Sequence, residues 1–246
     1  MDPMKRKPQS NRGVHRKPEV IFSLEQANDR LLDIFRNHGF GDFPHSERVR
    51  LAEFYVLLMT HQLTDNVTRL TKFRDVAIKH FIDSLIITRF TKLTFPLLDI
   101  GTGAGFPGIP LKIMFPKEKI ILAEGVKRRV DFLKAVRDEM KLENLDIIGR
   151  NIDPNFVYPV KGAITRAVEV ISQTLKNVSQ SLEVGGQVFL MKGPNVEPEI
   201  REAKREWGEY FELIKDKEYE LPQTPNQRRL VVYRKIKTPK IEQIEQ

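Results

Sequence analysis

The sequence contains no cysteine among its 246 residues. This absence excludes a disulfide framework, metal sites built on thiolates and a cysteine nucleophile, and it is compatible with a reducing cytosol. Residues 1–19 are polar and contain no apolar run, so they lack the pattern of a secretory signal. No segment approaches the roughly 18 apolar residues that a membrane-spanning helix needs. We therefore expect a soluble, cytoplasmic protein without a bound metal.

Acidic residues are scarce at the amino-terminal end. Residues 1–18 contain six Lys or Arg against the single Asp2, a net charge of +5, which leaves +3 of the total +8 for the rest of the chain. The basic balance, with a pI near 9.6, favours a polyanionic partner. Residues 1–18 also have few apolar side chains, which predicts a disordered basic tail. The tail is either merely solvated or an electrostatic tether to RNA, and both can hold at once.

Residues 19–93 are predicted to form a helical extension. Ser23 and Gln26 have the spacing of a capping box, and apolar residues at helical spacing follow until Gly39. Two further helices are expected over about 46–62 and 74–90.

The pattern changes at Thr94, where strands begin to alternate with helices. Short apolar strands are expected at 96–100, 120–123, 145–148, 162–165, 187–191, 211–215 and 230–234, with helices at 127–140, 170–182 and 197–206. Such alternation predicts an α/β fold with a doubly wound, mostly parallel sheet. We assign residues 94–236 to this domain and residues 237–246 to a flexible polar tail.

The strongest local signal is a glycine-rich turn over residues 99–108, which reads Asp-Ile-Gly-Thr-Gly-Ala-Gly-Phe-Pro-Gly. It follows a strand and opens a helix, which is where open α/β sheets bind nucleosides. Residues 103–108 fit the dinucleotide pattern G-x-G-x-x-G. Asp99, two residues before the first glycine, is more typical of methyltransferases. Glu124, which ends the next strand, is placed to bind ribose hydroxyls of either cofactor.

The turn closely resembles that of the bacterial small-subunit rRNA guanine-N7 methyltransferase family, also called glucose-inhibited division protein B. The continuation Gly-Phe-Pro-Gly-Ile-Pro, residues 105–110, is unusual among methyltransferases and makes the resemblance specific. Other segments match in the same order, and the resemblance covers about residues 22–236. These segments are 66–71 (Asn-Val-Thr-Arg-Leu-Thr), 80–85 (His-Phe-Ile-Asp-Ser-Leu), 127–133 (Lys-Arg-Arg-Val-Asp-Phe-Leu), 142–144 with Arg150, 165–167 (Thr-Arg-Ala), 191–193 (Met-Lys-Gly) and 229–232 (Arg-Leu-Val-Val).

The resemblance implies a Rossmann-like class I methyltransferase with a seven-stranded sheet and an N-terminal helical extension. It implies S-adenosylmethionine as cofactor and a guanine in the decoding-region loop of 16S rRNA, within the small ribosomal subunit, as target. Together with the turn, it gives these candidate cofactor-binding residues: Asp99, Gly101, Thr102, Gly103, Gly105, Phe106, Glu124, Asn151, Ile152 and Arg166.

The sequence departs from the family pattern at two places. Ile152 stands where the family usually has an acidic residue, and Asp153 comes one position later. Glu124-Gly125 replaces the usual Asp-Ser, which keeps a carboxylate. A divergent member of the family is therefore expected.

Transfer of a methyl group to guanine N7 needs no general base, because N7 has a lone pair and no proton. Catalysis is then expected from positioning. The candidates for orienting the substrate are Arg166, Lys192 and His80, each of which is alternatively a structural contact. Asp83 and Ser84, close to His80, either line the substrate side or tie the extension to the core. A further basic set either contacts RNA or is simply solvated: Arg128, Arg129, Arg228, Arg229, Arg234 and Lys235.

Two other function classes stay open on the sequence. One is an S-adenosylmethionine-dependent methyltransferase acting on another RNA or a small molecule. The other is a non-catalytic Rossmann module that binds a nucleotide or RNA. We expect a monomer in each case.

Overall fold

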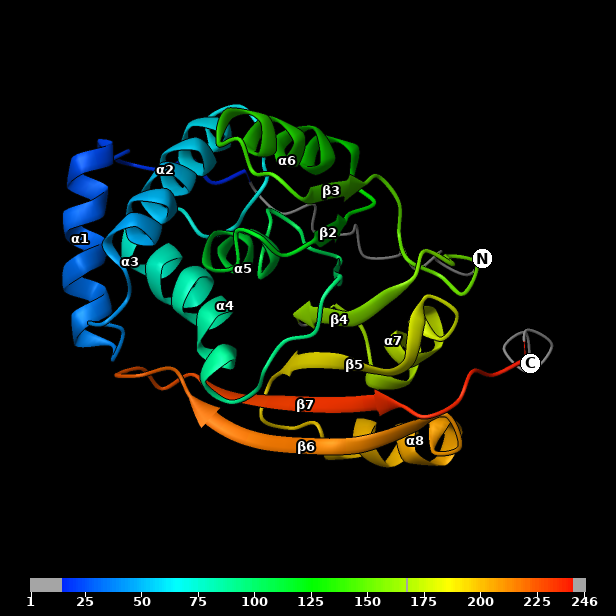
Figure 1. Ribbon diagram of the computed structural model, residues 1–246. Helices are drawn as coiled ribbons and strands as arrows, with labels where there is room; N and C mark the ends of the chain where they lie inside the picture. Colours follow the sequence, from blue (N-terminus) through cyan, green and yellow to red (C-terminus); the bar gives the residue numbers. More distant parts are fainter. Residues whose placement is uncertain (1–14, 167, 241–246) are drawn as a thin grey trace, which may run out of the picture.

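The computed structural model describes residues 15–166 and 168–240 (Figure 1). Helices precede the first strand, and strands then alternate with helices. In chain order the elements are α1 (Leu24–Asn37), α2 (His45–Gln62), α3 (Phe73–Val76), the π-helical η1 (Ala77–Ile82), α4 (Asp83–Leu85), the 3₁₀ turn η2 (Ile86–Arg89), β1 (Leu97–Ile100), α5 (Gly108–Met114), β2 (Ile120–Ala123), α6 (Lys127–Glu139), β3 (Leu145–Ile148), β4 (Val160–Arg166), α7 (Ile171–Val178), β5 (Leu182–Lys192), α8 (Glu197–Trp207), β6 (Phe211–Glu220) and β7 (Gln227–Lys235).

The strands form one seven-stranded sheet in the order β3-β2-β1-β4-β5-β7-β6. Strands β1 to β5 are mutually parallel, and β7 pairs antiparallel with both β5 and β6. The predicted doubly wound, mostly parallel sheet is confirmed. After β3 the chain crosses to the other side of β1, and open α/β sheets bind ligands at the carboxyl ends of the strands beside such a switch point.

The sheet is covered on both faces because its inner strands alternate between two hydrophobic clusters. Leu97 packs toward α5, α6 and the N-terminal helices, whereas Leu98 packs toward α7 and α8. The strand period of two directs consecutive side chains to opposite faces. In Figure 1, α1, α2 and α6 accordingly lie above and beside the strands, and α7 and α8 lie at the opposite side.

The N-terminal helices share their core with the sheet. The predicted capping box is present: Ser23 accepts the backbone N–H of Gln26, whose side chain accepts the N–H of Ser23. The fully buried Phe54 of α2 meets Phe106 of the glycine turn at 5.3 Å between ring centroids and Phe132 of α6 at 6.5 Å. The extension is therefore packed directly against the turn.

Several elements differ in extent from the sequence prediction; for example, the helix expected over 170–182 ends at Val178, and β5 begins at Leu182 rather than at residue 187. The helix expected over 74–90 is divided into α3, η1, α4 and η2, and hydroxyls within it bind backbone carbonyls, Ser84 that of His80 at 2.5 Å and Thr88 that of Leu85 at 2.7 Å. Such side-chain bonds compete with regular helix pairing. Strand β6 is about twice its predicted length, because most of its side chains are exposed and leave no apolar alternation to detect.

The chain ends differ from the predicted tails. The side-chain amide of Gln62 donates to the backbone carbonyl of Arg16 at 2.7 Å. The ring of His15 binds the backbone carbonyl of Gln62, also at 2.7 Å. At the other end, Pro239 is buried and accepts a hydrogen bond from Gln180 at 3.0 Å. Residues 15–18 and 237–240 are thus held against the domain. The remainder of both predicted tails, 1–14 and 241–246, lies outside the described residues.

Two absences hold for the described part of the chain. None of its helices combines the length and apolar character needed to cross a membrane. Within the same residues, no group of three or more His, Asp or Glu side chains is arranged to hold a metal ion.

Candidate functional site

A buried carboxylate at the end of β1 fixes the conformation of the glycine turn. Asp99 of β1 is fully buried, and its Oδ2 accepts the hydroxyl of Thr102 at 2.6 Å and the N–H of Gly108 at 2.8 Å. Asp99 thereby fixes both ends of the turn. Its other oxygen, Oδ1, is buried without a hydrogen-bond partner. A buried acceptor of this kind fits a ligand that brings a donor.

Glycine is required at Gly101 and Gly103, whose φ angles of +65° and +63° disfavour other residues. A side chain at Gly101 would meet Val168 at 2.9 Å, whereas nothing lies within 4 Å of the place where a side chain at Gly103 would project. The turn is therefore covered by Val168 on one side and open at Gly103. Val168 is not recognisable from the sequence, because its contact with Gly101 arises only from the neighbouring positions of β1 and β4 in the sheet.

Burial raises the pKa of Asp99 from 3.8 to about 6, although the bonds from Thr102 and Gly108 oppose the shift. Because the folded-state pKa is raised, the folded protein binds a proton over a pH range in which the unfolded chain does not. The contribution of Asp99 to stability therefore increases as pH falls from 7 to 4. Relative to Asp99→Asn, the wild-type free energy of unfolding should rise by about 2 kcal/mol over this range.

Chemical denaturation of the ligand-free wild type and of Asp99→Asn, carried out at a series of pH values, measures this difference. All other titrating groups cancel between the two proteins. A difference that stays constant from pH 7 to pH 4 would contradict the raised pKa of Asp99.

A second carboxylate connects the turn to the next strand. Glu124 follows β2 and is 5% exposed; it accepts the N–H of Gly103 at 3.0 Å and that of Val126 at 2.8 Å. Arg129 lies 3.5 Å from the same carboxylate. Since each carboxylate oxygen accepts more than one hydrogen bond, Glu124 retains capacity for ribose hydroxyls.

The departures from the family pattern lie after β3. Asn151 is exposed, and its side chain occupies the place where a side chain at position 125 would project. Gly125 thus makes room for Asn151. The side chain of Ile152 is buried in the cluster that faces α7 and α8.

Three side chains pack against one another at the glycine turn: His80 of the extension, Phe106 of the turn itself and Arg166 at the end of β4, which together are called the wall. The ring of His80 stacks on Phe106 at 4.0 Å between centroids, with 10° between the planes. Its Nδ1 accepts from Arg166 at 3.0 Å, which leaves Nε2 to donate to the hydroxyl of Thr68 at 3.1 Å. Burial, with a further contribution from Arg166, lowers the pKa of His80 well below its usual value. The imidazole is therefore neutral at physiological pH.

Arg166 joins the end of β4 to this wall. It donates to the carbonyl of Lys79 at 2.9 Å, forms an ion pair with Asp83 at 3.4 Å, and lies 5.5 Å from the centroid of the Phe106 ring. Arg228 of β7 pairs with the same Asp83 at 3.3 Å. Burial raises the pKa of Asp83, and the two arginines oppose that shift. Asp83 is buried and connects the extension to β4 and β7 through the two arginines, whereas the buried Ser84 donates to the carbonyl of His80 within the same segment.

Lys192 has a different environment from Arg166, although both end strands at the same edge. Its ammonium donates to the carbonyl of Glu169 and pairs with Glu199 of α8 at 2.8 Å, and the side chain is 8% exposed. In this structure Lys192 holds α8 against the loop after β4.

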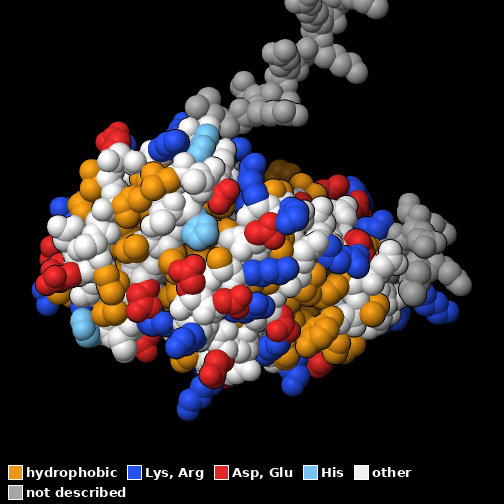
Figure 2. Space-filling view, turned by 90° about the horizontal axis from the view of Figure 1, so that it is seen from above, with side chains coloured by type: hydrophobic (Ala, Val, Ile, Leu, Met, Phe, Trp, Pro, Cys, Tyr) orange, Lys and Arg blue, Asp and Glu red, His pale blue; other side chains and the backbone are white. Residues whose placement is uncertain are grey.

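Most of the predicted basic set is engaged within the protein. Arg229 binds Asp216 at 2.6 Å, Arg234 binds Glu212 at 2.6 Å, and the buried Lys235 donates to the carbonyl of Ser179 at 2.6 Å. In Figure 2, Lys and Arg side chains are interspersed with Asp and Glu over the face that is seen.

Comparison with known families decides the assignment. Residues 48–231, which include the glycine turn and the wall, match the family model GidB, described as rRNA small subunit methyltransferase G. The chain belongs to the GidB family. It is thus a methyltransferase, as the resemblance of the turn indicated.

Individual GidB relatives agree. Ribosomal RNA small subunit methyltransferase G 2 of Bdellovibrio bacteriovorus is 64% identical over 92% of this chain and 88% of its own length. The protein of the same name from Syntrophobacter fumaroxidans is 41% identical over 86% of this chain, but the match spans only 42% of that protein. A solved structure from work on the conversion of a disulfide bond into a thioacetal group in echinomycin biosynthesis shares the fold. It has a TM-score of 0.51 at 9% identity, covering 62% of this chain and 81% of its own.

The GidB site can be tested for fit to S-adenosylmethionine, the cofactor of this family. An open cradle at Gly103, a carboxylate at the end of β2 and a buried unpartnered oxygen on Asp99 are the features that such a nucleoside with an ammonium group requires. The residues present therefore fit the cofactor.

Proposed function

We propose that this protein transfers a methyl group from S-adenosylmethionine to N7 of a guanine in the decoding-region loop of 16S rRNA. The observation that carries the proposal is the contact that His80 and Arg166 make with Phe106 of the glycine turn. Family membership supports the reaction class, and the names of the relatives support the small-subunit RNA as substrate. Family membership also favours this function over a non-catalytic nucleotide-binding module.

We assign the cofactor to the turn and the strand ends. Gly101, Thr102, Gly103 and Gly105 would cradle the methionine part, with the ammonium directed to Asp99. Glu124 would accept hydrogen bonds from the ribose hydroxyls. The backbone at Asn151 and Ile152 would meet the adenine; an acidic side chain at position 152 is then not needed, because its place in the core is taken by isoleucine.

When bound, the cofactor supplies an electrophilic methyl group on a sulfonium. The N7 lone pair forms the new C–N bond as the C–S bond breaks, which leaves a neutral thioether and a positive charge on the methylated guanine. No proton moves. The protein must therefore hold N7 in line with the methyl group and exclude water, a positioning effect.

The wall residues are suited to positioning rather than to proton transfer. His80 is neutral, and both of its ring nitrogens are engaged. Arg166 is paired with Asp83, which reduces the repulsion between its guanidinium and the sulfonium. Phe106 is buried beneath the ring of His80 and packs on Phe54, so it holds that ring in place. Lys192 is assigned to holding the loop after β4 rather than to orienting the substrate.

The test is methyl transfer from labelled S-adenosylmethionine to RNA that carries the target loop, compared with the same RNA in which the target guanosine is replaced by 7-deazaguanosine. The replacement substitutes carbon for N7 and leaves the Watson–Crick edge unchanged. Transfer should be lost while RNA binding stays within about twofold. Equal transfer to both RNAs would contradict methylation at N7.

We further propose that the protein acts as a monomer in the cytoplasm, where its ribosomal substrate is found. All residues assigned to the site come from one chain, so no second copy is needed to complete it. The basic segment 1–14 is proposed as an additional tether to RNA, and its deletion should flatten the salt dependence of binding.

A further inference from the structure

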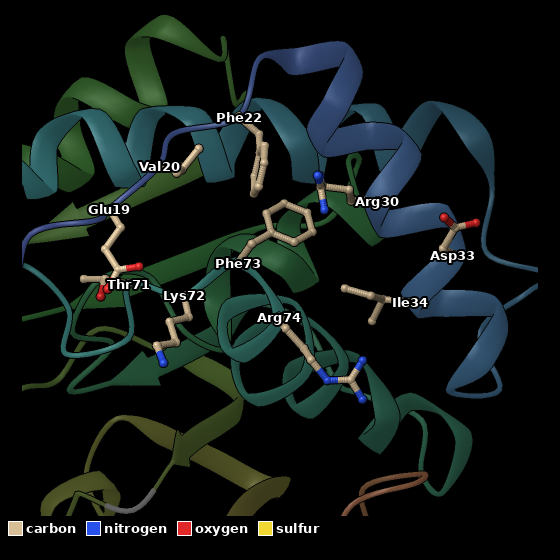
Figure 3. Close-up of a pocket in the computed structure, with 10 residues that line it drawn as sticks. All are labelled: Glu19, Val20, Phe22, Arg30, Asp33, Ile34, Thr71, Lys72, Phe73 and Arg74. Carbon is tan, nitrogen blue, oxygen red and sulfur yellow. The ribbon is translucent and has the colours of Figure 1, made fainter.

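Two adjoining cavities lie on the N-terminal extension, away from the glycine turn. The first has a volume of about 500 Å³ and lies between α1 and the segment that leads into α3 (Figure 3). The second, of about 470 Å³, shares Glu19, Thr71 and Lys72 with the first. We call the two together the extension pocket.

The first cavity has an aromatic floor. The rings of Phe22 and Phe73 meet edge to face at 5.3 Å between centroids, and both are half-buried. The guanidinium of Arg30 lies 4.0 Å from the centroid of the Phe22 ring. Figure 3 shows the two rings next to each other, with Arg30 beside them and Arg74 below them in this view. Aromatic rings and guanidinium planes of this kind are the surfaces on which unpaired bases stack.

The extension pocket is rich in cations without ion-pair partners. Within the described residues, no carboxylate lies within ion-pair distance of the six basic side chains that line it, whereas Lys79 nearby is paired with Asp75 at 2.7 Å. The acidic lining residues are Glu19, Asp33 and that same Asp75. The six cations are Arg16, Lys17, Arg30, Arg69, Lys72 and Arg74. An excess of unpaired cations beside an aromatic floor fits a ligand with both a base and phosphates.

A single buried side chain holds the walls together. Gln62 is fully buried; its Oε1 accepts the N–H groups of Val67 and Thr68 at 3.0 Å each, and its Nε2 donates to the carbonyl of Arg16 at 2.7 Å. The chain that carries Arg16 and the loop that carries Arg69 are therefore fixed relative to each other. The extension pocket is a built feature rather than a chance gap between loops.

The extension pocket is linked to the wall through a hydrogen bond. Thr68 precedes Arg69 in the chain, and its hydroxyl is bound by the ring of His80, which stacks on Phe106. Arg69 of the extension pocket is therefore the chain neighbour of a residue that contacts the wall.

We propose that the extension pocket holds an unpaired nucleotide of the RNA strand next to the methylated guanine, a proposal that rests on the proposed function. The base lies against Phe22 and Phe73, and its exocyclic amine donates a hydrogen bond to Glu19 or Asp33. The flanking phosphates contact Arg69 and Lys72. The ligand is a single-stranded RNA segment, because the cations continue along the second cavity beyond the room for one base.

The test measures the affinity of the full chain for a single-stranded RNA of the target loop at several salt concentrations. The pocket variant carries Arg69→Gln, Lys72→Gln and Arg74→Gln. The control variant carries Lys117→Gln, Lys134→Gln and Arg201→Gln, which removes the same charge at exposed positions outside the extension pocket. In the pocket variant the salt slope of log K should fall by at least about 1.4, since the phosphate contacts of Arg69 and Lys72 each contribute about 0.7 on a single strand.

Further readouts separate direct contact from general electrostatics. The pocket variant should show at least a tenfold rise in Kd and in KM for RNA, with kcat unchanged within threefold. Phe22→Leu keeps the apolar volume but loses the π-face, and it should raise Kd about fivefold or more. Ultraviolet cross-links from the RNA should map to segments 16–22 and 69–74.

Equal slopes for the pocket and control variants would overturn the proposal, as would cross-links confined to other segments. So would saturation of the extension pocket by guanosine monophosphate alone, with RNA affinity unaffected by the pocket variant. The proposed function has a separate readout, the formation of 7-methylguanosine. A pocket-dependent slope without any 7-methylguanosine formed would leave the extension pocket standing and overturn the reaction, and a methylating protein with equal slopes would do the reverse.

Discussion

Replacing Arg166 by methionine should lower kcat/KM for RNA methylation about 100-fold, because the wall that faces the turn loses the side chain that fixes it. The guanidinium bonds the carbonyl of Lys79, the carboxylate of Asp83 and the ring of His80. The same change leaves Asp83 buried with Arg228 as its remaining partner. The free energy of unfolding should therefore fall by about 3 kcal/mol.

A second substitution separates the two effects. In the double variant Arg166→Met, Asp83→Asn the buried charge is gone, so most of the lost stability should return while methyl transfer does not. Arg229→Met is the control for removal of a well-buried arginine: it loses bonds to Asp216, which costs about 2 kcal/mol, and leaves kcat/KM within threefold. Full recovery of activity in the double variant would mean that Arg166 acts on stability alone.

Changing Gly103 to alanine should abolish tight cofactor binding while the protein stays folded. The φ of +63° makes alanine unfavourable by about 1 kcal/mol, and no atom lies within 4 Å of the new methyl group. The methyl group would project into the open cradle of the turn. The affinity for S-adenosylmethionine, measured by calorimetry, should fall at least tenfold.

Gly185 provides a matched control, because it has a φ of +88°, equally open space and a position in β5 away from the turn. Gly185→Ala should lose a similar stability and keep the wild-type cofactor affinity. If the two alanine variants bind the cofactor equally well, the cradle does not lie at Gly103.

Local features of the site could be predicted from the sequence. Asp99, the glycines and Glu124 are recognisable because each lies within a few residues of a buried apolar strand, and parallel strands end at one edge of the sheet. The partners of these residues could not be predicted in the same way. Asp99 was expected to contact the cofactor, and nothing in its spacing reveals that one of its oxygens is already occupied by Thr102 and Gly108.

Long-range ion pairs account for most of the site features that cannot be predicted from the sequence. Lys192 and Arg166 look equivalent in the sequence, because each ends a strand at the same edge. They differ only because Glu199 of α8 reaches one and Asp83 of α4 reaches the other. The irregular segment η1 was also hidden, since its apolar spacing is that of an ordinary helix. Widened helical turns of this type are frequent at functional sites, and this one carries His80.

The most direct test of the account is methyl transfer from labelled S-adenosylmethionine to small ribosomal subunits that lack the modification, followed by digestion and identification of the labelled nucleoside. The account predicts 7-methylguanosine, formed by the wild type and by the Gly185→Ala variant and lost in Gly103→Ala. Label in any other nucleoside, or no label although the cofactor binds, would contradict it.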